Sequence, residues 1–131
     1  MPYYERETKF RNLPYRKRGR KIRVYIAGPI TGIPSFNRAA FAEAECTLRN
    51  LGYDVFNPTA PGLKYPDYNP EDPRPVHLRR DLVELTKADA VYLLPEYWTT
   101  FANIEKYIAI ELELPVFYRN GRYFSCWRKR K

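Results

Sequence analysis

Two carboxylates in the second half of the chain stand in positions where acidic side chains can do chemistry. Asp81 lies within RRDLVELTKADA, and Glu105 lies within TTFANIEKYIA. A carboxylate that faces a sugar can attack its anomeric carbon or stabilise a transition state with oxocarbenium character. A carboxylate near the start of a helix can also be an ordinary surface charge that the helix dipole favours. The two residues alone leave both interpretations open.

A glycine- and proline-rich turn follows an apolar segment in KIRVYIAGPITGIPSFNRAAF. Gly28 and Gly32 allow a ligand to approach the backbone closely, and Thr31 offers a hydroxyl group. Backbone amides before a helix can bind an anion. The turn matches neither the GxGxxG pattern nor the P-loop pattern, so we expect a small ligand rather than a dinucleotide or a triphosphate. Such turns can also serve only to connect two elements.

These residues need a sheet to position them, and the apolar pattern predicts one. Four segments are rich in apolar, β-branched and aromatic residues, as buried parallel strands are: 22–27, 53–56, 90–94 and 116–118. Residues 122–127 either add a short fifth strand or wrap the surface. In a parallel sheet, ligands bind beyond the carboxyl ends of the strands, where the turn at Gly28 and the segment before Glu105 emerge.

Three segments between the strands have apolar residues at helical spacing: about 36–51, 76–87 and 100–113. We expect Ser35 to cap the first helix, with Cys46 reduced and buried on its apolar side. In the third helix we expect Ile104, Ile108 and Leu112 to face inward. The alternation of strands and helices predicts an α/β fold, an open parallel sheet of four or five strands with helices on both faces.

A long loop at 57–75 contains six prolines and separates the second strand from the second helix. Loops of this length in compact domains are often lids or binding segments, although a loop can also only fill surface space. His77, just after this loop, is better interpreted as a helix residue than as a metal ligand.

The net charge of +8 is concentrated at the two ends of the chain. Residues 1–21 hold eight Lys and Arg against two acids, residues 119–131 hold six and no acid, and the segment 22–118 is acidic overall. Basic arms with interleaved aromatic residues can bind nucleic acid, and they can equally be solubilising ends. No apolar run reaches the length of about 18 residues that a membrane span needs, and no secretory signal is visible. We therefore expect a cytoplasmic protein with no membrane association and no disulfide.

Three stretches, VYIAGPITG, NRAAFAEAECTLRNLGYDVFNP and RRDLVELTKADAVYLLP, resemble the nucleoside 2-deoxyribosyltransferase-like superfamily, and most closely its small phage and bacterial members of uncharacterised function. The resemblance covers residues 22–118. It implies a flavodoxin-like, Rossmann-like domain between a basic N-terminal arm (1–21) and a basic aromatic C-terminal tail (119–131). It also implies cleavage of N-glycosidic bonds by a Glu nucleophile, without metal or cofactor. Relatives are dimers or larger, which implies a homo-oligomer.

The resemblance assigns roles to individual positions. Glu105 matches the nucleophile, and Asp81 matches an acidic residue that serves proton transfer or sugar contact. Thr99 matches a position that is Ser in the nucleotide-hydrolysing branch, which favours a nucleotide over a free nucleoside. Phe101 stands where relatives have Gly, a departure that could narrow the pocket. The expected substrate-binding residues are Tyr25, Gly28, Pro29, Ile30, Thr31, Gly32, Asn37, Thr99 and Phe101.

Two functions follow from these observations. The first is an enzyme that cleaves the N-glycosidic bond of a (deoxy)nucleoside 5′-monophosphate, by hydrolysis or by deoxyribosyl transfer, with a cytoplasmic location that would be the host cytoplasm for a phage protein. The second is an inactive relative that binds a nucleotide, or that uses its basic tails to bind nucleic acid or a protein partner. Phe101 and the tails favour the second function, whereas Glu105, Asp81 and Thr99 favour the first.

Overall fold

A computed structural model describes residues 3–6, 16–17, 19–30, 32–95, 102–120 and 123–127 of the chain. Four parallel strands form the larger part of its main sheet: β4 (Arg23–Ala27), β5 (Asp54–Phe56), β6 (Ala90–Leu93) and β7 (Val116–Asn120). Their order across the sheet is β5-β4-β6-β7, with Tyr25 paired to Phe56 on one side and to Val91 on the other. This is the flavodoxin-like order, and its switch point lies between the carboxyl ends of β4 and β6. The predicted α/β class is confirmed.

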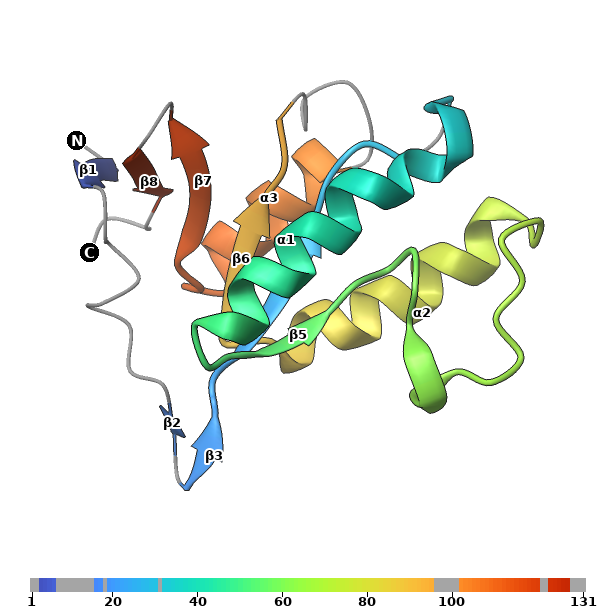
Figure 1. The fold of residues 1–131 in the computed structure, drawn as a ribbon, viewed down its shortest axis with the longest axis horizontal. Helices are drawn as coiled ribbons and strands as arrows, with labels where there is room; N and C mark the ends of the chain where they lie inside the picture. The colour runs from blue at the N-terminus through green and yellow to red at the C-terminus, as the bar shows by residue number, and fades with distance from the viewer. Residues whose placement is uncertain are drawn as a thin grey trace.

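Strands from the two ends of the chain extend the sheet beyond β7. β8 (Tyr123–Trp127) pairs antiparallel with β7, so the optional fifth strand is present. β1 (Tyr3–Arg6), which the sequence did not predict, pairs antiparallel with β8 and makes the sheet six-stranded. A separate two-stranded hairpin of β2 (Arg16–Lys17) and β3 (Arg20–Lys21) lies near the start of β4 (Figure 1). The basic end segments thus contribute backbone to both sheets.

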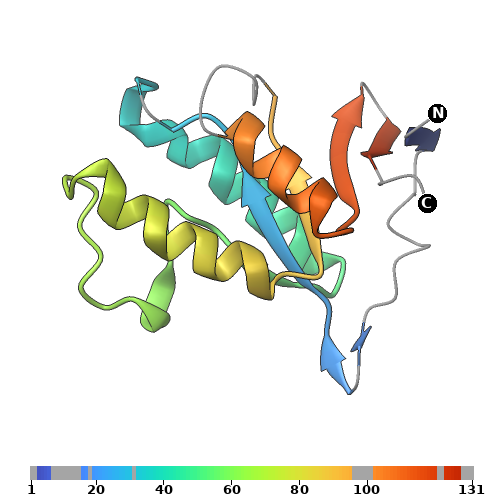
Figure 2. The same ribbon diagram turned by 180° about the vertical axis from the view of Figure 1, so that it is seen from behind.

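Helices cover both faces of the sheet. α1 (Arg38–Asn50) lies on the face seen in Figure 1 and packs Phe41, Ala44 and Leu48 against the strands. α2 (Arg74–Lys87) and α3 (Ala102–Glu111) lie on the opposite face (Figure 2), where they share a second core with the strands. Within the described ranges, no helix has the length and apolarity to cross a membrane.

The first helix begins later than its sequence pattern predicted. Ser35, the expected N-cap, instead lies in a 3-10 turn at Pro34–Asn37, and Asn37 precedes the first residue of α1 without a side-chain capping bond. Ser35, Phe36 and Asn37 all have left-handed φ angles of 53°, 56° and 59°. The expectation of a buried Cys46 is also wrong, because it lies off the stripe of α1 that packs on the sheet and its side chain is exposed.

The third helix buries a different stripe from the one predicted. Ile104 and Leu112 are exposed at 51% and 47%, whereas Ala102, Glu105, Lys106 and Ala109 are buried. The small side chains of Ala102 and Ala109 let the helix lie close to β4, β6 and β7. Ile108, which was also predicted to face inward, is partly buried and packs against this core, so the prediction holds for Ile108 and is wrong for Ile104 and Leu112.

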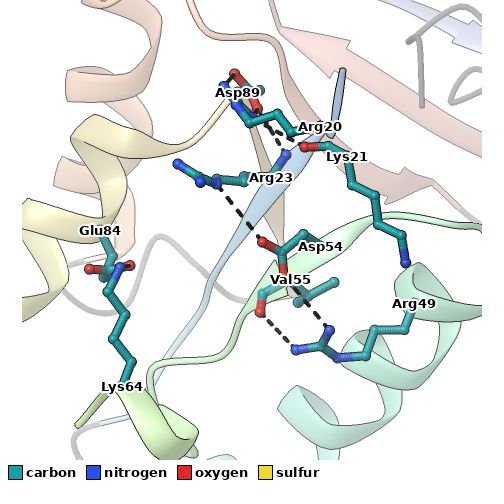
Figure 3. Close-up of polar contacts among 9 residues, drawn as sticks. All are labelled: Arg20, Lys21, Arg23, Arg49, Asp54, Val55, Lys64, Glu84 and Asp89. Atoms are coloured by element: carbon teal, nitrogen blue, oxygen red, sulfur yellow. Dashed lines mark hydrogen bonds and ion pairs between the residues drawn. The ribbon is translucent and has the colours of Figure 1, made fainter. Parts of the chain in front are cut away.

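Ion pairs connect residues at the amino ends of the parallel strands (Figure 3). Asp89, just before β6, accepts two hydrogen bonds from the Arg20 guanidinium at 2.6 and 3.0 Å and one from the Arg23 backbone N–H at 2.9 Å. Asp54, at the start of β5, lies 3.9 Å from Arg23 and 3.8 Å from Arg49. The Arg20–Asp89 pair ties the β2–β3 hairpin to the sheet, and the Asp54 pairs join β5 to β4 and α1, all at the end opposite to the switch point.

Candidate active site

A cavity of about 290 Å³ lies beyond the carboxyl ends of β4 and β6. The turn after β4, the loop before α2, and the helices α2 and α3 all contribute to its wall. The residues that line it are Gly28, Ile30, Gly32, Phe36, Pro58, Tyr68, Pro70, Asp72, Arg74, His77, Leu78, Arg80, Asp81, Ala102 and Glu105. The cavity therefore occupies the place where this fold class binds ligands.

The turn after β4 forms one side of the cavity through Gly28, Ile30 and Gly32. A Cβ atom on Gly28 would lie 2.8 Å from the Leu94 side chain, so glycine is needed there for the close packing of β4 on the segment after β6. Gly32 has a φ of +80°, a conformation that other residues rarely adopt. Asn37 donates from Nδ2 to the Pro29 carbonyl oxygen at 3.0 Å, which holds the turn in place.

Glu105 is placed in the first turn of α3 and faces the cavity with an exposed fraction of only 6%. The hydroxyl of the fully buried Tyr25, on β4, donates a hydrogen bond to Glu105 Oε2. Burial raises the pKa of Glu105 to about 8, and the negative charge of Asp81 adds to this, while Tyr25 and the positive charge of Arg74 oppose it. Burial and the nearby Glu105 in turn raise the pKa of Tyr25 well above its ordinary value, so its hydroxyl is a stable donor.

Asp81 enters the same cavity from α2. Its Oδ1 accepts hydrogen bonds from Arg80 Nε at 2.9 Å and from Arg80 Nη2 at 2.6 Å. Burial raises the pKa of Asp81 to about 6, although the adjacent Arg80 charge lowers it. The raised pKa values of both carboxyls mean that the pair retains a proton near neutral pH.

Each carboxylate is held by one oxygen. Tyr25 binds Oε2 of Glu105 and Arg80 binds Oδ1 of Asp81, whereas Oε1 and Oδ2 have no hydrogen-bond partner in the part of the chain that the structure describes. A buried carboxylate oxygen without a partner is costly and uncommon in a purely structural role. The arrangement fits two carboxylates that are oriented by the protein and left with one oxygen each for a ligand.

The proline-rich loop at 57–75 forms one wall of the cavity, which is the position that a binding segment would take. Pro58, Tyr68, Pro70 and Asp72 all line the cavity. The Tyr68 ring lies edge-on to the His77 ring, with centroids 5.7 Å apart. α2 begins at Arg74, two residues earlier than predicted, with Pro75 in its first turn where proline is well tolerated.

The structure brings together most of the residues that the sequence singled out. Gly28, Ile30, Gly32, Asp81 and Glu105 line the cavity. Tyr25 donates to the lining residue Glu105, and Asn37 holds the turn through the carbonyl oxygen of Pro29, which does not itself line the cavity. Thr31, Thr99 and Phe101 lie outside the described residues.

The sequence analysis missed several cavity residues, chiefly Arg80, Arg74, Tyr68 and Phe36, and it did not place His77 at the site. Arg80 precedes Asp81 directly, and that adjacency was the one available signal. Among the described residues, no cluster of three or more His, Cys, Asp or Glu side chains is arranged to hold a metal ion.

The fold and cavity define a class of protein. A solved structure of 2-deoxyribosyltransferase from the psychrotolerant bacterium Bacillus psychrosaccharolyticus, described as a biocatalyst for synthesis of antiviral and antitumoral nucleosides, is similar to this chain. The TM-score is 0.57 at 25% sequence identity, over 73% of this chain and 70% of that one. This chain therefore has the nucleoside 2-deoxyribosyltransferase-like fold.

The sequence of the chain also identifies the family to which it belongs. Residues 22–118 match the model of the family described as Domain of unknown function (DUF4406), and the chain belongs to that family. No curated protein matches the chain significantly.

Proposed function

We propose that this protein cleaves the N-glycosidic bond of a 2′-deoxynucleoside 5′-monophosphate, with Glu105 as the nucleophile and Asp81 as the proton-transfer group. The observation that carries the proposal is the pair of oriented carboxylates in one cavity, Glu105 buried and Asp81 13% exposed, each with one oxygen that has no hydrogen-bond partner among the described residues. The fold shared with a 2-deoxyribosyltransferase supports the reaction class.

The charge state of the pair suits this reaction. A departing nucleobase needs a proton, and the attacking carboxylate must be ionised, so the two groups together need one proton between them. The raised pKa values of Glu105, to about 8, and of Asp81, to about 6, keep one proton on the pair near neutral pH. The higher pKa of Glu105 places that proton on Glu105 in the free chain, so bound substrate must shift the proton to Asp81 and leave the charge on Glu105.

The reaction then balances in two steps. Glu105 attacks C1′, the bond from C1′ to the base nitrogen breaks, and the proton of Asp81 passes to the base. In the second step, Asp81 takes a proton from water, the water oxygen attacks C1′, and Glu105 leaves as a carboxylate. A second nucleobase in place of water would complete a deoxyribosyl transfer.

The cavity also has groups that suit a monophosphate. Arg74 lines it with a positive charge that acts on Glu105, and the turn at Gly28 and Gly32 offers backbone amides. We propose that this turn, together with Thr31 and Thr99, binds the ribose and the 5′-phosphate.

The proposal is tested by incubating the full chain with each deoxynucleoside 5′-monophosphate and with the matching deoxynucleoside, and separating the products by chromatography. We expect free base to appear, and to appear faster from the monophosphate. Addition of a second base distinguishes transfer from hydrolysis. Binding of a nucleotide without release of base would instead indicate the alternative, a nucleotide-binding protein.

A further inference from the structure

Arg80 is a nearly buried arginine whose guanidinium joins two parts of the site. Its side chain is only 10% exposed. Nε and Nη2 bind Asp81 Oδ1, and Nη2 also donates to the Pro58 carbonyl oxygen at 2.9 Å. A single group on α2 therefore contacts the carboxylate and the first part of the cavity loop.

Three aromatic rings surround the same guanidinium. Its central carbon lies 4.9 Å from the ring centroid of Tyr68, 5.8 Å from that of Tyr65 and 6.0 Å from that of Phe56. Phe56 in turn stacks on Tyr25 at 5.5 Å, and the Tyr25 hydroxyl binds Glu105. Arg80 is thus packed into an assembly that reaches both carboxylates.

The pairing of Arg80 with Asp81 is not one that a helix forms by default. Adjacent residues on an α-helix point in different directions, and the pairs that usually interact are three or four residues apart. The Arg80 side chain must be held in a curved path to reach its neighbour. The rings and the Pro58 carbonyl provide that restraint.

We infer that Arg80 is a positioning residue of this site, which fixes Asp81 by one oxygen and couples that carboxylate to the cavity loop at Pro58 and Tyr68. The catalytic part of this inference rests on the proposed function, whereas the control of Asp81 does not. Lysine cannot replace this role fully, because it lacks the planar fork that binds two acceptors at once.

The charge of Arg80 acts directly on Asp81, which is surrounded by other ionisable groups. These are His77 and Glu84 on α2, Glu105 on α3, Tyr25 on β4, and Tyr65 and Tyr68 in the loop. In the described part of the chain, only Arg80 donates hydrogen bonds to Asp81. Removal of this cation should therefore raise the pKa of Asp81 more than removal of any other single group.

Four variants of the full chain separate the possibilities. Arg80→Met removes the charge and the fork but keeps an apolar chain against the rings, and Arg80→Lys keeps the charge alone. Arg79→Met is the matched control, because Arg79 is the preceding residue on α2 and is exposed to solvent. Asp81→Asn identifies the Asp81 signal.

The test is a carbon-13 NMR titration of the aspartate carboxyl groups. In Arg80→Met we expect the titration midpoint of Asp81 to rise by roughly one to two pH units, whereas Arg79→Met leaves it within a few tenths. In Arg80→Lys we expect a smaller rise, so this variant decides the question if Arg80→Met does not fold. An unchanged Asp81 midpoint in the folded Arg80 variants would overturn the inference.

Kinetics give the second readout. We expect Arg80→Met to lower kcat by roughly tenfold or more with a smaller change in KM, and to have almost no further effect in an Asp81→Asn background. Equal losses in both backgrounds would contradict a role through Asp81. If the wild-type chain releases no base, the proposed function fails, while the NMR titration still decides the role of Arg80.

Discussion

The two ends of the parallel sheet use acidic side chains in opposite ways. At the amino end, Asp89 accepts three hydrogen bonds from Arg20 and the Arg23 backbone, and its charge is matched by a cation (Figure 3). At the carboxyl end, Glu105 and Asp81 share a cavity, and each has one oxygen without a hydrogen-bond partner in the described part of the chain. The first arrangement ties segments together, whereas the second leaves charge and hydrogen-bonding capacity for a ligand.

Burial alone does not make this difference, as two residues of one helix demonstrate. Glu84 is buried, and the Asp81 side chain is 13% exposed. Burial would raise the pKa of Glu84, but hydrogen bonds from Lys64 and Tyr65 at 2.7 Å outweigh burial and lower it. Three residues earlier, burial of Asp81 outweighs the effect of Arg80, and the pKa rises to about 6. The number of partners for each oxygen separates the structural carboxylate from the candidate catalytic one.

Among the substitutions at the two ends of the sheet, Glu105→Gln should have the largest effect. An amide cannot attack C1′, so we expect base release to fall by several orders of magnitude. The Tyr25 hydroxyl can still donate to the amide oxygen, so the circular dichroism spectrum should not change. Retention of turnover in a folded Glu105→Gln protein would remove Glu105 from the mechanism.

Asp81→Asn should have the next largest effect. Loss of the proton-transfer group should lower kcat by roughly 10²- to 10⁴-fold, since general acid–base catalysis contributes about that much. Deoxynucleotides with a better leaving base need less proton donation and should lose less. A uniform loss for good and poor leaving groups would indicate that Asp81 contacts the sugar instead.

The burial of Glu105 should also make the stability of the folded chain depend on pH. Glu105 has an ordinary pKa of 4.5 and a pKa of about 8 in the folded chain, so the unfolded chain releases this proton first as the pH rises. Stability is therefore lost between pH 4.5 and pH 8, and the penalty is complete above pH 8. Glu105→Gln avoids this penalty, so at pH 8.5 it should be more stable than wild type by on the order of a few kcal/mol, with little difference at pH 4.

Urea unfolding at the two pH values measures this difference. Glu43→Gln, at an exposed position on α1, is the matched control and should show no such pH-dependent gain. If wild type and Glu105→Gln had parallel stability profiles, Glu105 would not carry the burial cost that we assign to it.

The smallest expected effects lie at the amino end. Asp89→Ala should lower Tm by roughly 5 °C or more, because it leaves the Arg23 N–H and the Arg20 guanidinium without their acceptor. Asp54→Ala, at a side chain 52% exposed with partners near 4 Å, should lower Tm by less than about 2 °C. Neither substitution should change kcat more than about twofold in a nucleotide assay. A large loss of activity in Asp89→Ala would contradict the separation of the two ends.

The parts of this molecule that follow local patterns could be predicted from the sequence. The four parallel strands have continuous apolar runs, and the turn at Gly28 and the carboxylates at 81 and 105 stand where this topology places ligands. β1 could not be predicted in the same way, because its residues become a strand only by pairing with β8, more than a hundred positions away in the chain.

The residues that surround the carboxylates could not be predicted from local sequence patterns either. Arg80 and Tyr68 contact each other only after the proline-rich loop has folded back onto α2, and neither residue type by itself indicates that contact. The sequence pattern did not indicate the buried face of α3, because the buried residues there are two alanines and two charged side chains rather than large apolar ones. Contacts between segments far apart in the sequence therefore orient the side chains of the candidate site.

The most direct measurement of the central claim is the capture of the sugar on Glu105. A deoxynucleoside 5′-monophosphate with fluorine at C2′ should form the glycosyl-enzyme and then release it slowly, because the fluorine destabilises the oxocarbenium character needed for release. Intact-protein mass spectrometry should then detect the added sugar phosphate, and peptide mapping should place it on Glu105, with no adduct in Glu105→Gln. An adduct on Asp81, or release of base with no adduct at any time point, would contradict Glu105 as the nucleophile.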